Sequence, residues 1–319
     1  MLMHIEESVM ATTEIIASLV KLFLMIIPGY ILGKSQVMSE EQSKGLSTVI
    51  INVTWPCLIV ISLQRQFSTE LCINMGILAA AMVCAIIIAF LLARILGRFM
   101  KLDKSKTYLM TFMLLFGNTG FMGIPVCTVL YGGEGTFYAA LVDAVQDVFI
   151  FTVGILLIER STGKHIGLSV KHFLTPGVAS IVIGLGLFIA GITLPDIISV
   201  PMNTVGSATS PLAMIVVGFQ LGQLNLKDLI SDKRLYVMSA VRLLIIPLIF
   251  LVGVILIFPE MSLLCKVLVV EMATPVAACT TIYAQQYGGD VGFATKGVMQ
   301  STVLSIITLS AFAVIAELI

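Results

Sequence analysis

Ten stretches of apolar residues, separated by short polar stretches, run along almost the whole chain. Each is about 20 residues long, the length that a helix needs to cross the hydrocarbon core of a bilayer. Strands of a membrane barrel would be about half as long and would alternate apolar with polar residues. The pattern therefore predicts membrane-spanning helices. Their approximate limits are 14–33, 45–63, 73–96, 108–131, 136–158, 173–191, 204–223, 235–257, 264–286 and 292–316.

The composition strengthens this interpretation. Of 319 residues, 58% are hydrophobic and 11% are charged, and the mean hydropathy is +1.08. A soluble domain carries about 25% charged residues, so these values exclude a soluble enzyme and a disordered scaffold. The net charge of zero gives no support to a nucleic-acid partner. The loops are too short for a separate soluble domain, and we expect an integral protein of a bacterial cytoplasmic membrane.

Residues that bind metals or catalyse reactions are sparse and scattered. None of the six cysteines forms a C-x-x-C pair, and the three histidines do not cluster. The chain also has no zinc-hydrolase motif, and its one close pair of aspartates lies on a single predicted helix. We therefore expect no enzyme activity, no metal site and no prosthetic group, with H⁺ or Na⁺ as the only candidate cofactors.

Lysine and arginine lie mainly on one side of the predicted membrane. If the N-terminus is placed outside, fourteen of these residues fall in or beside the cytoplasmic loops, and only Arg65 and Lys266 fall outside. Positive residues concentrate on the cytoplasmic side of membrane proteins. The distribution therefore predicts an even number of spans with both termini outside.

The two halves of the chain share short patterns at similar offsets. Tyr131-Gly-Gly-Glu returns as Tyr287-Gly-Gly-Asp 156 residues later, and Trp55-Pro is matched by Ser210-Pro 155 residues later. A repeat of five helices is inverted relative to its copy, which is typical of secondary transporters. A chance match of short motifs is the alternative. We predict an all-α polytopic membrane protein with ten transmembrane helices in a 5+5 inverted repeat. Its halves are 1–160 and 161–319.

The fourth and ninth segments contain the residues least suited to a continuous helix. Residues 116–126 read FGNTGFMGIPV, and residues 271–281 read EMATPVAACTT. Glycine and proline weaken a helix, so we expect breaks, and a break inside a membrane is tolerated where it lines a cavity. The half-helix that follows a break offers free N–H groups to an anion. A plain kink with glycine packing is the alternative. The predicted helix-breaking residues are Gly120, Gly123, Pro125 and Pro275.

These residues resemble the auxin efflux carrier family of transporters. The stretch from Gly117 to Pro125 is similar to that family's N-T-x-x-M-G-I-P signature, and Ser210-Pro211, Arg242 and Tyr287-Gly288 are similar to further family patterns. The resemblance implies that helices four and nine unwind and cross, that the substrate carboxylate binds at the crossing, and that the protein is a homodimer. The expected substrate-binding residues are Gly117, Asn118, Thr119, Thr274, Pro275 and Asn52.

Two departures from the plant members bear on the substrate. Gly117 stands where they have proline, and Val276 stands where they have glutamine. A site for an aromatic acid is therefore not expected, and a small aliphatic mono- or dicarboxylate fits better. We predict a secondary transporter of small organic anions.

Charged residues inside the predicted spans are candidates for ion coupling. Asp143 and Asp147 share one helix face, at depths of about 10 and 16 Å from the outer surface. They are expected to bind a proton or an ion, or alternatively to pair with Lys21 or Arg242. Glu271 is also a coupling candidate, facing either the crossing or the headgroups. Lys21 is expected to attract the anion or to pair with Asp147, and Arg242 to extend toward the headgroups.

Two points stay open in the sequence. The first is a sodium-coupled carrier similar to the bile-acid symporters, in which Na⁺ would bind at the crossing. Its candidate ligands are Thr274, Thr280, Thr281 and Glu271. A channel is a weaker alternative. The second is the role of Gly29-x-x-x-Gly33 and Gly218-x-x-x-Gly222, which permit close helix packing within or between subunits.

Overall fold

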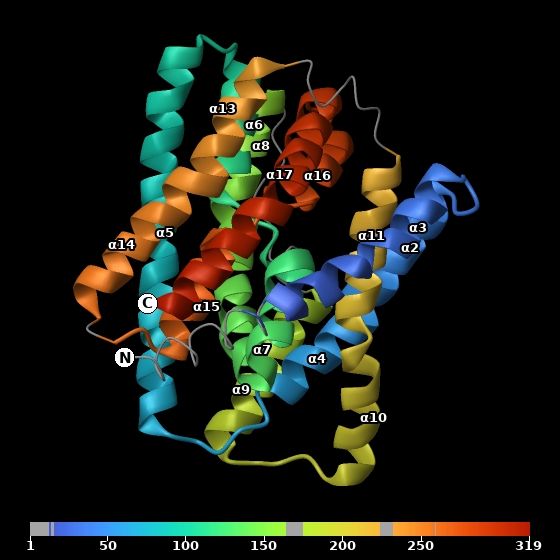
Figure 1. Ribbon diagram of the computed structural model, residues 1–319, viewed down its shortest axis with the longest axis vertical. Helices are drawn as coiled ribbons and strands as arrows, with labels where there is room; N and C mark the ends of the chain where they lie inside the picture. The colour runs from blue at the N-terminus through green and yellow to red at the C-terminus, as the bar shows by residue number, and fades with distance from the viewer. Residues whose placement is uncertain (1–12, 14–15, 164–174, 224–231, 259) are drawn as a thin grey trace.

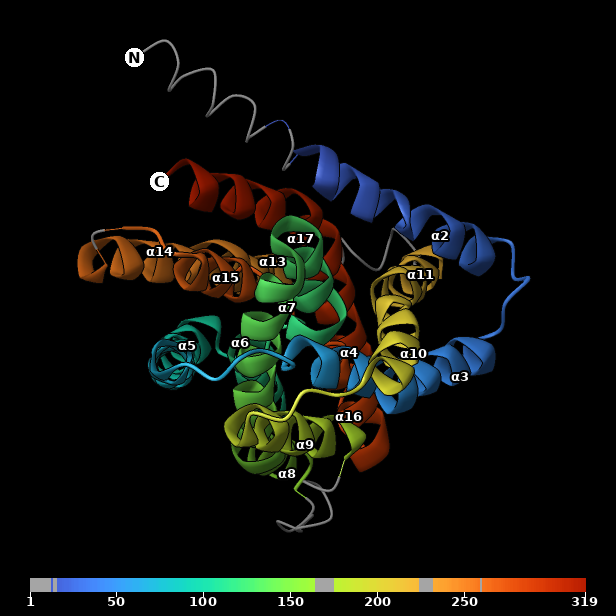
Figure 2. The ribbon, with the colours of Figure 1, turned by 90° about the horizontal axis from the view of Figure 1, so that it is seen from below.

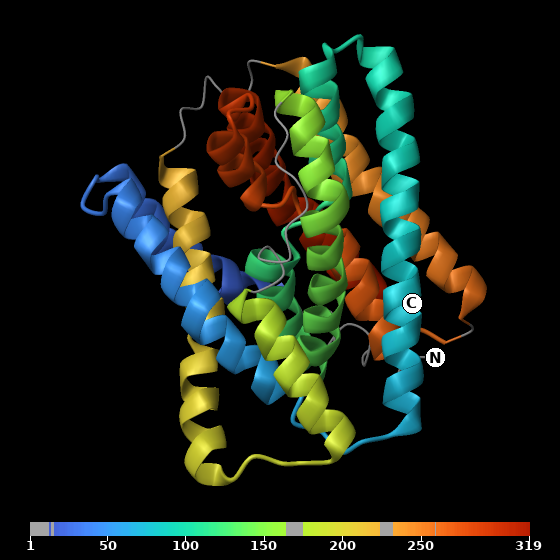
Figure 3. The ribbon, with the colours of Figure 1, turned by 180° about the vertical axis from the view of Figure 1, so that it is seen from behind.

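The computed structural model describes residues 13, 16–163, 175–223, 232–258 and 260–319, and the regular structure within them is helical (Figures 1 and 3). Seven of the described helices are long and apolar enough to cross a membrane. They are Ile16–Lys34, Glu40–Ser62, Thr69–Met100, Thr119–Thr162, Asp196–Gly222, Lys233–Ile257 and Val291–Leu318. The protein is therefore an all-helical, polytopic integral membrane protein, as its apolar pattern predicts.

Several of these helices contain short π-helical turns, which are designated η. The elements of the first half are α2 (Ile26–Lys34), α3 (Glu40–Val49), η1 (Ile50–Thr54), α4 (Trp55–Ser62), α5 (Thr69–Met100), α6 (Lys104–Leu115), η2 (Thr119–Gly123), α7 (Ile124–Phe149), η3 (Ile150–Gly154) and α8 (Ile155–Thr162). Those of the second half are α9 (Pro176–Ala190), α10 (Asp196–Ser207), α11 (Thr209–Gly222), α13 (Lys233–Ala240), η5 (Val241–Ile245), α14 (Ile246–Ile257), α15 (Leu263–Met272), α16 (Cys279–Tyr287) and α17 (Val291–Leu318).

Helix lies in each of the ten predicted segments, but three of them do not form a long helix of their own. The fourth and ninth segments are interrupted, which leaves the short helices α6, α15 and α16. The sixth contributes α9, which has 15 residues. The boundary between the fourth and fifth segments is a kink inside α7 at Gly132, whose φ is 62°. A sharp bend thus takes the place of the predicted loop.

Several helices have side-chain caps at their N-termini, near the ends of the molecule. At α3, Ser39 accepts a hydrogen bond from the backbone N–H of Gln42, and Gln42 in turn accepts one from the N–H of Ser39. This reciprocal cap satisfies two of the N–H groups that a helix start leaves free. Asp232 caps α13 without this reciprocity, because its side chain accepts from the backbone N–H of Arg234. Hydrogen bonds from the side chain of Arg234 hold the pKa of the Asp232 carboxyl below its ordinary value.

Helices α2 and α11 pack against each other through a row of glycines, which we call the glycine seam (Figure 2). It consists of Gly29, Gly33, Gly218 and Gly222. A Cβ at Gly29 would meet the carbonyl oxygen of Ile215, and one at Gly218 would meet that of Ile26. The two Gly-x-x-x-Gly motifs therefore bring the backbones together within one chain.

The interrupted helices lie in the interior of the molecule. Every residue of α6 from Leu109 to Leu115 is buried, and so is every residue of α15 from Leu264 to Met272 except Lys266. A helix that is apolar on all sides is surrounded by protein or lipid. Helices α5 and α14 lie at the outside of the molecule (Figure 2), and they expose large side chains such as Leu91 and Leu256. Apolar exposure of this kind is suited to contact with lipid.

Candidate functional site

Two non-helical stretches interrupt the fourth and ninth segments near the middle of the molecule. In the first, α6 ends at Leu115 and helix resumes at Thr119. In the second, α15 ends at Met272 and α16 begins at Cys279. Pro275 lies in the second stretch. The other predicted helix-breaking residues follow the first stretch, within η2 or in the first turn of α7. They are Gly120, Gly123 and Pro125.

The two stretches pair with each other by backbone hydrogen bonds. Gly117 and Val276 form an antiparallel bridge. The N–H of Asn118 donates to the carbonyl of Pro275 at 2.7 Å, and the N–H of Ala277 donates to the carbonyl of Phe116 at 3.0 Å. We call residues 116–118 and 275–277 the paired breaks. Their pairing satisfies peptide groups that the loss of helix would otherwise leave bare in the interior.

Gln146 of α7 also forms hydrogen bonds with the first break. Its Oε1 accepts from the N–H of Gly117 at 3.0 Å, and its Nε2 donates to the carbonyl of Gly117 at 2.9 Å. The same Nε2 lies 2.7 Å from the hydroxyl oxygen of Thr119. The primary amide of glutamine thus binds the peptide of Gly117 as a neighbouring strand would.

Of the two aspartates on α7, Asp143 joins this network. It is 3% exposed, and one of its carboxylate oxygens accepts from the hydroxyl of Thr119 at 2.5 Å. Asp147 is half-buried and lies close to Cys279 and Tyr283. Neither aspartate forms an ion pair in the part of the chain that the structure describes. Lys21, a predicted partner, is instead exposed on the first helix.

Glu271 lies in the interior rather than at the headgroups. It is fully buried in the last turn of α15, where its carboxylate faces Gly123 and accepts a 3.6 Å hydrogen bond from the thiol of Cys127. Its second oxygen, Oε2, has no hydrogen-bond partner among the described residues. A buried carboxylate oxygen left without a partner is costly when the group is charged.

Arg242 does not extend toward the headgroups, so that expectation is wrong. It is 2% exposed and lies in η5, a π-helical turn of the eighth segment. Its guanidinium donates to the carbonyls of Leu114 and Thr274 at 3.2 and 3.1 Å, and to the hydroxyl of Thr274 at 3.3 Å. The rule for long basic side chains applies to residues that face lipid, whereas this side chain points between the paired breaks.

A cavity of about 830 Å³ lies beside the paired breaks, between α3 and α11 on one side and α16 and α17 on the other. We call it the polar cavity. Asn118 is the residue of the paired breaks that lines it. Other polar residues in its wall are Glu40, Ser43, Lys44, Ser47, Thr48, Gln220, Gln223, Thr281, Gln285, Thr295 and Lys296. Apolar residues such as Phe121 and Val217 complete the wall.

The other predicted substrate-binding residues are not in this wall. Gly117, Thr119, Thr274 and Pro275 are buried, and their contacts support the paired breaks from behind. Asn52 is exposed in η1, and its side-chain amide donates to the carbonyl of Thr48 at 2.7 Å. The structure therefore brings Asn118, but not Asn52, to the polar cavity.

Sequence reasoning missed two contacts made by the paired breaks and η2. The first is the pair of hydrogen bonds from Gln146 to Gly117. The sequence feature that could have indicated it is a glutamine between two aspartates in an apolar span. The second is the indole of Trp55, which lies against Gly120 of η2 and meets Phe121 edge-on at 6.0 Å between ring centroids. The sequence shows only an aromatic residue on one helix and a glycine on another. The tertiary fold is needed to show that they are in contact.

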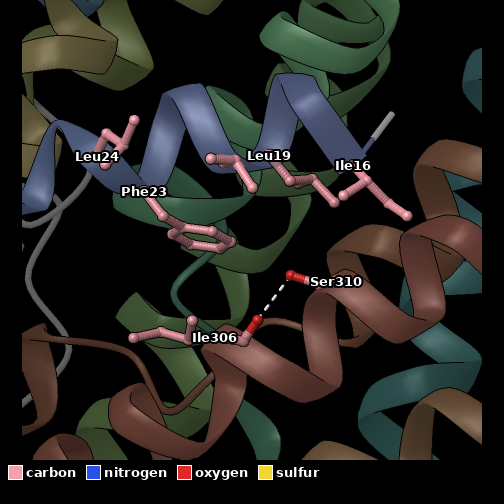
Figure 4. A pocket seen from close by; sticks show the side chains of 7 residues that line it. Ile16, Leu19, Phe23, Leu24, Ile306 and Ser310 are labelled. Atoms are coloured by element: carbon pink, nitrogen blue, oxygen red, sulfur yellow. Dashed lines mark hydrogen bonds between the residues drawn. The ribbon is translucent and has the colours of Figure 1, made fainter. Parts of the chain in front are cut away.

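A second hollow, which we call the apolar crevice, has a volume of about 360 Å³ and lies between the first helix and α17 (Figure 4). Its lining is aliphatic and aromatic except for Ser310, whose hydroxyl already donates to the carbonyl of Ile306 at 2.6 Å (Figure 4). Such a surface suits an acyl chain better than a carboxylate. The polar cavity is therefore the candidate site.

Comparison with known proteins connects these features with transport. The model of a family described as membrane transport proteins matches residues 14–167 and 165–313. The chain is 29% identical over 315 residues to an uncharacterized transporter of Methanothermobacter thermautotrophicus, covering 96% of this chain and 99% of the relative.

Two further relatives extend the likeness. The uncharacterized transporter MJ1031 of Methanocaldococcus jannaschii is 24% identical over 302 residues, which cover 90% of this chain and 94% of the relative. The uncharacterized transporter YfdV of Escherichia coli K12 is 20% identical over 217 residues, 66% of this chain and 69% of the relative.

Proposed function

Because the chain belongs to the membrane transport protein family that includes the auxin efflux carriers, we propose that it is a secondary carrier of small organic anions. The cargo is a mono- or dicarboxylate, and it crosses the cytoplasmic membrane by alternating access. The family assignment supports transport across a membrane, and the nature of the cargo follows from the chemistry of the polar cavity.

The observation that carries the proposal is the side chain of Asn118, which lines the polar cavity without a hydrogen bond to any other described residue. This residue is the N-cap of η2, a position at which asparagine commonly bonds to the helix, yet its side chain makes no capping bond. Helix α16 also begins without a side-chain cap, and Ala278 and Cys279 at its start line the polar cavity. An amide donor and a helix N-terminus therefore face one space, and both favour a carboxylate.

The size and lining of the polar cavity favour a small, partly polar cargo. Its volume of about 830 Å³ lies within the usual range for ligand pockets. The amides of Gln220, Gln223 and Gln285 offer donors and acceptors, and the aromatic residues in the lining are Phe121 and Phe219. These amides favour an aliphatic acid with a second polar group.

The proposed architecture is ten spans in a 5+5 inverted repeat, with both termini outside. It is supported by helix in all ten predicted segments and by a break in the fourth segment of each half. The predicted cytoplasmic end of the molecule is the end at which Lys44 of α3 and Lys296 of α17 lie. On this orientation the polar cavity opens inward, and alternating access moves the paired breaks past the wall that contains α3 and α11.

We further propose that protons drive transport, with the coupling groups among Asp143, Asp147 and Glu271. The support is geometric. Asp143 is linked through Thr119 and Gln146 to the first break, so adding a proton to Asp143 changes a hydrogen-bond network that holds Gly117. A carrier that uses this link binds or releases a proton as the paired breaks move.

The test is uptake of labelled acids into proteoliposomes. Malonate, malate, lactate and an indole acid are each supplied with an inward proton gradient, an inward sodium gradient, or neither. We expect saturable, proton-driven uptake of one aliphatic acid, lowered at least about tenfold by Asn118→Ala because one hydrogen bond to a charged ligand contributes roughly 1.5–3 kcal/mol.

The matched control is Asn203→Ala, an exposed asparagine on α10, which should transport as the natural protein does. Uptake that Asn118→Ala leaves unchanged would rule out the paired breaks as the binding site. Drive by sodium alone would favour the sodium-coupled alternative.

A further inference from the structure

The guanidinium of Arg242 lies where two half-helices end. It bonds to the carbonyl of Leu114 in the last turn of α6, and to the carbonyl of Thr274 just beyond α15. The last four carbonyls of a helix have no partner within the helix. Arg242 therefore supplies donors to carbonyls from both helix ends at once.

At this point one positive charge faces two partial negative charges. A helix carries roughly half a negative charge at its C-terminus, and two such ends meet here. One guanidinium offsets both, and its planar fork reaches acceptors that lie in different directions. Among the described residues its hydrogen bonds go to Leu114 and Thr274 alone, and none goes to a carboxylate.

Gly117 provides the space that this arrangement needs. A Cβ at Gly117 would collide with Nη2 of Arg242 and with the hydroxyl of Thr274. Any larger residue at this position would displace the guanidinium. The glycine that distinguishes this sequence at the first break is thus explained by the arginine on another helix.

The oxygen atoms of Thr274 that would otherwise help to hold a cation are already engaged. The carbonyl and the hydroxyl of Thr274 both accept from Arg242, and the hydroxyl of Thr280 donates to the carbonyl of Ala277 at 2.7 Å. These were candidate ligands for sodium in the alternative function. With Arg242 in place, the lone pairs of the two Thr274 oxygens already serve a positive charge that belongs to the chain.

We propose that Arg242 is the resident counter-cation of the paired breaks, occupying the position at which an alkali cation would otherwise join the two helix ends. The assembly of the paired breaks then requires no bound sodium. This role concerns the architecture of the site and is independent of the identity of the cargo. Arg242 acts as a positioning residue for Asn118, which neighbours Gly117.

The experiment compares Arg242→Lys with Arg242→Met in the full chain, purified into lipid nanodiscs. The two side chains have similar reach, and only lysine is charged. Thermal unfolding is followed by the emission of Trp55, the single tryptophan of the chain, which lies against Gly120 beside the paired breaks. Each variant is measured in choline, sodium and potassium chloride at equal ionic strength. Arg234→Met, an exposed arginine of α13, is the matched control.

We expect the unfolding temperature of the natural protein and of Arg242→Lys to be the same in all three salts. Arg242→Met should unfold about 5–10 °C lower, because buried carbonyls lose a charged donor. Arg234→Met should match the natural protein. Hydrophobic replacement of a buried charge often stabilises a protein, so an Arg242→Met variant as stable as Arg242→Lys would overturn the proposal.

A second measurement asks whether a cation can refill the position. In Arg242→Ala, guanidinium at about 10 mM should raise the unfolding temperature in a saturable way, whereas urea, a neutral molecule of nearly the same shape, should not. Equal effects of guanidinium and urea would overturn the proposal. So would a saturable rise of the natural protein's unfolding temperature with sodium, because sodium would then bind in addition to Arg242. If Arg242→Ala does not fold, the comparison of lysine with methionine decides.

Discussion

Replacing Gln146 with leucine should loosen the first break selectively. Gln146 is the partner of both the N–H and the carbonyl of Gly117, because the bridge to Val276 uses the peptide groups on either side of Gly117 instead. Leucine has nearly the same volume and no polar atoms. The change therefore leaves the N–H and the carbonyl of Gly117, one group from each of two adjacent peptide units, without partners and removes little packing.

The magnitude follows from these two hydrogen bonds. A buried donor or acceptor left unsatisfied costs about 1–3 kcal/mol, so the pair costs about 2–6 kcal/mol. At the lower end, with about 1.4 kcal/mol for each factor of ten, the population of the opened break rises about 30-fold. Amide exchange through such local openings rises by the same factor.

The assay is hydrogen–deuterium exchange with mass spectrometry on the full chain in nanodiscs, comparing peptides that cover residues 112–122 with peptides of α5. We expect faster exchange in the first set and unchanged exchange in the second. Gln286→Leu, on an exposed face of α16, is the control. Exchange of residues 112–122 within about twofold of the natural protein would refute the assigned role of Gln146.

Two further predictions concern packing and coupling. Gly218→Ala should lower the unfolding temperature, since its Cβ would meet the backbone carbonyl of Ile26 and overpacking costs about 1–3 kcal/mol; Gly253→Ala, which meets open space, is the control, and equal stability of the two variants would contradict the glycine seam. Asp143→Asn should keep the hydrogen bond from Thr119 and remain folded, while anion uptake loses its response to a proton gradient. Full proton-driven uptake by that variant would exclude Asp143 as the coupling group.

The sequence located the helices and interruptions well because both depend on local chemistry. Apolar runs predict buried helix, and the glycines and prolines around Asn118 and Pro275 weaken it where the structure has its paired breaks. The kink at Gly132 lies at the first residue of the predicted loop. Such features are properties of a segment and its neighbours along the chain.

The directions of polar side chains could not be predicted in this way. Arg242 was expected at the headgroups and lies between two helix ends, because its partners come from segments about 130 and 30 residues away in sequence. The partner of Asp143 is Thr119 rather than Lys21 or Arg242. For Asn118 the local signature pointed to a ligand site, and the structure adds that its side chain is free and lines a cavity.

The glycine seam also has a consequence for biosynthesis. Helix α2 is made roughly 190 residues before α11, and at 5–20 residues per second its glycine face waits about 10–40 s for its partner. During that interval the exposed small-residue surface is suited to pairing with the α2 of a neighbouring nascent chain. Completion of α11 closes this interval, so the membrane insertase has to retain the first helices of the chain until the seventh apolar segment emerges.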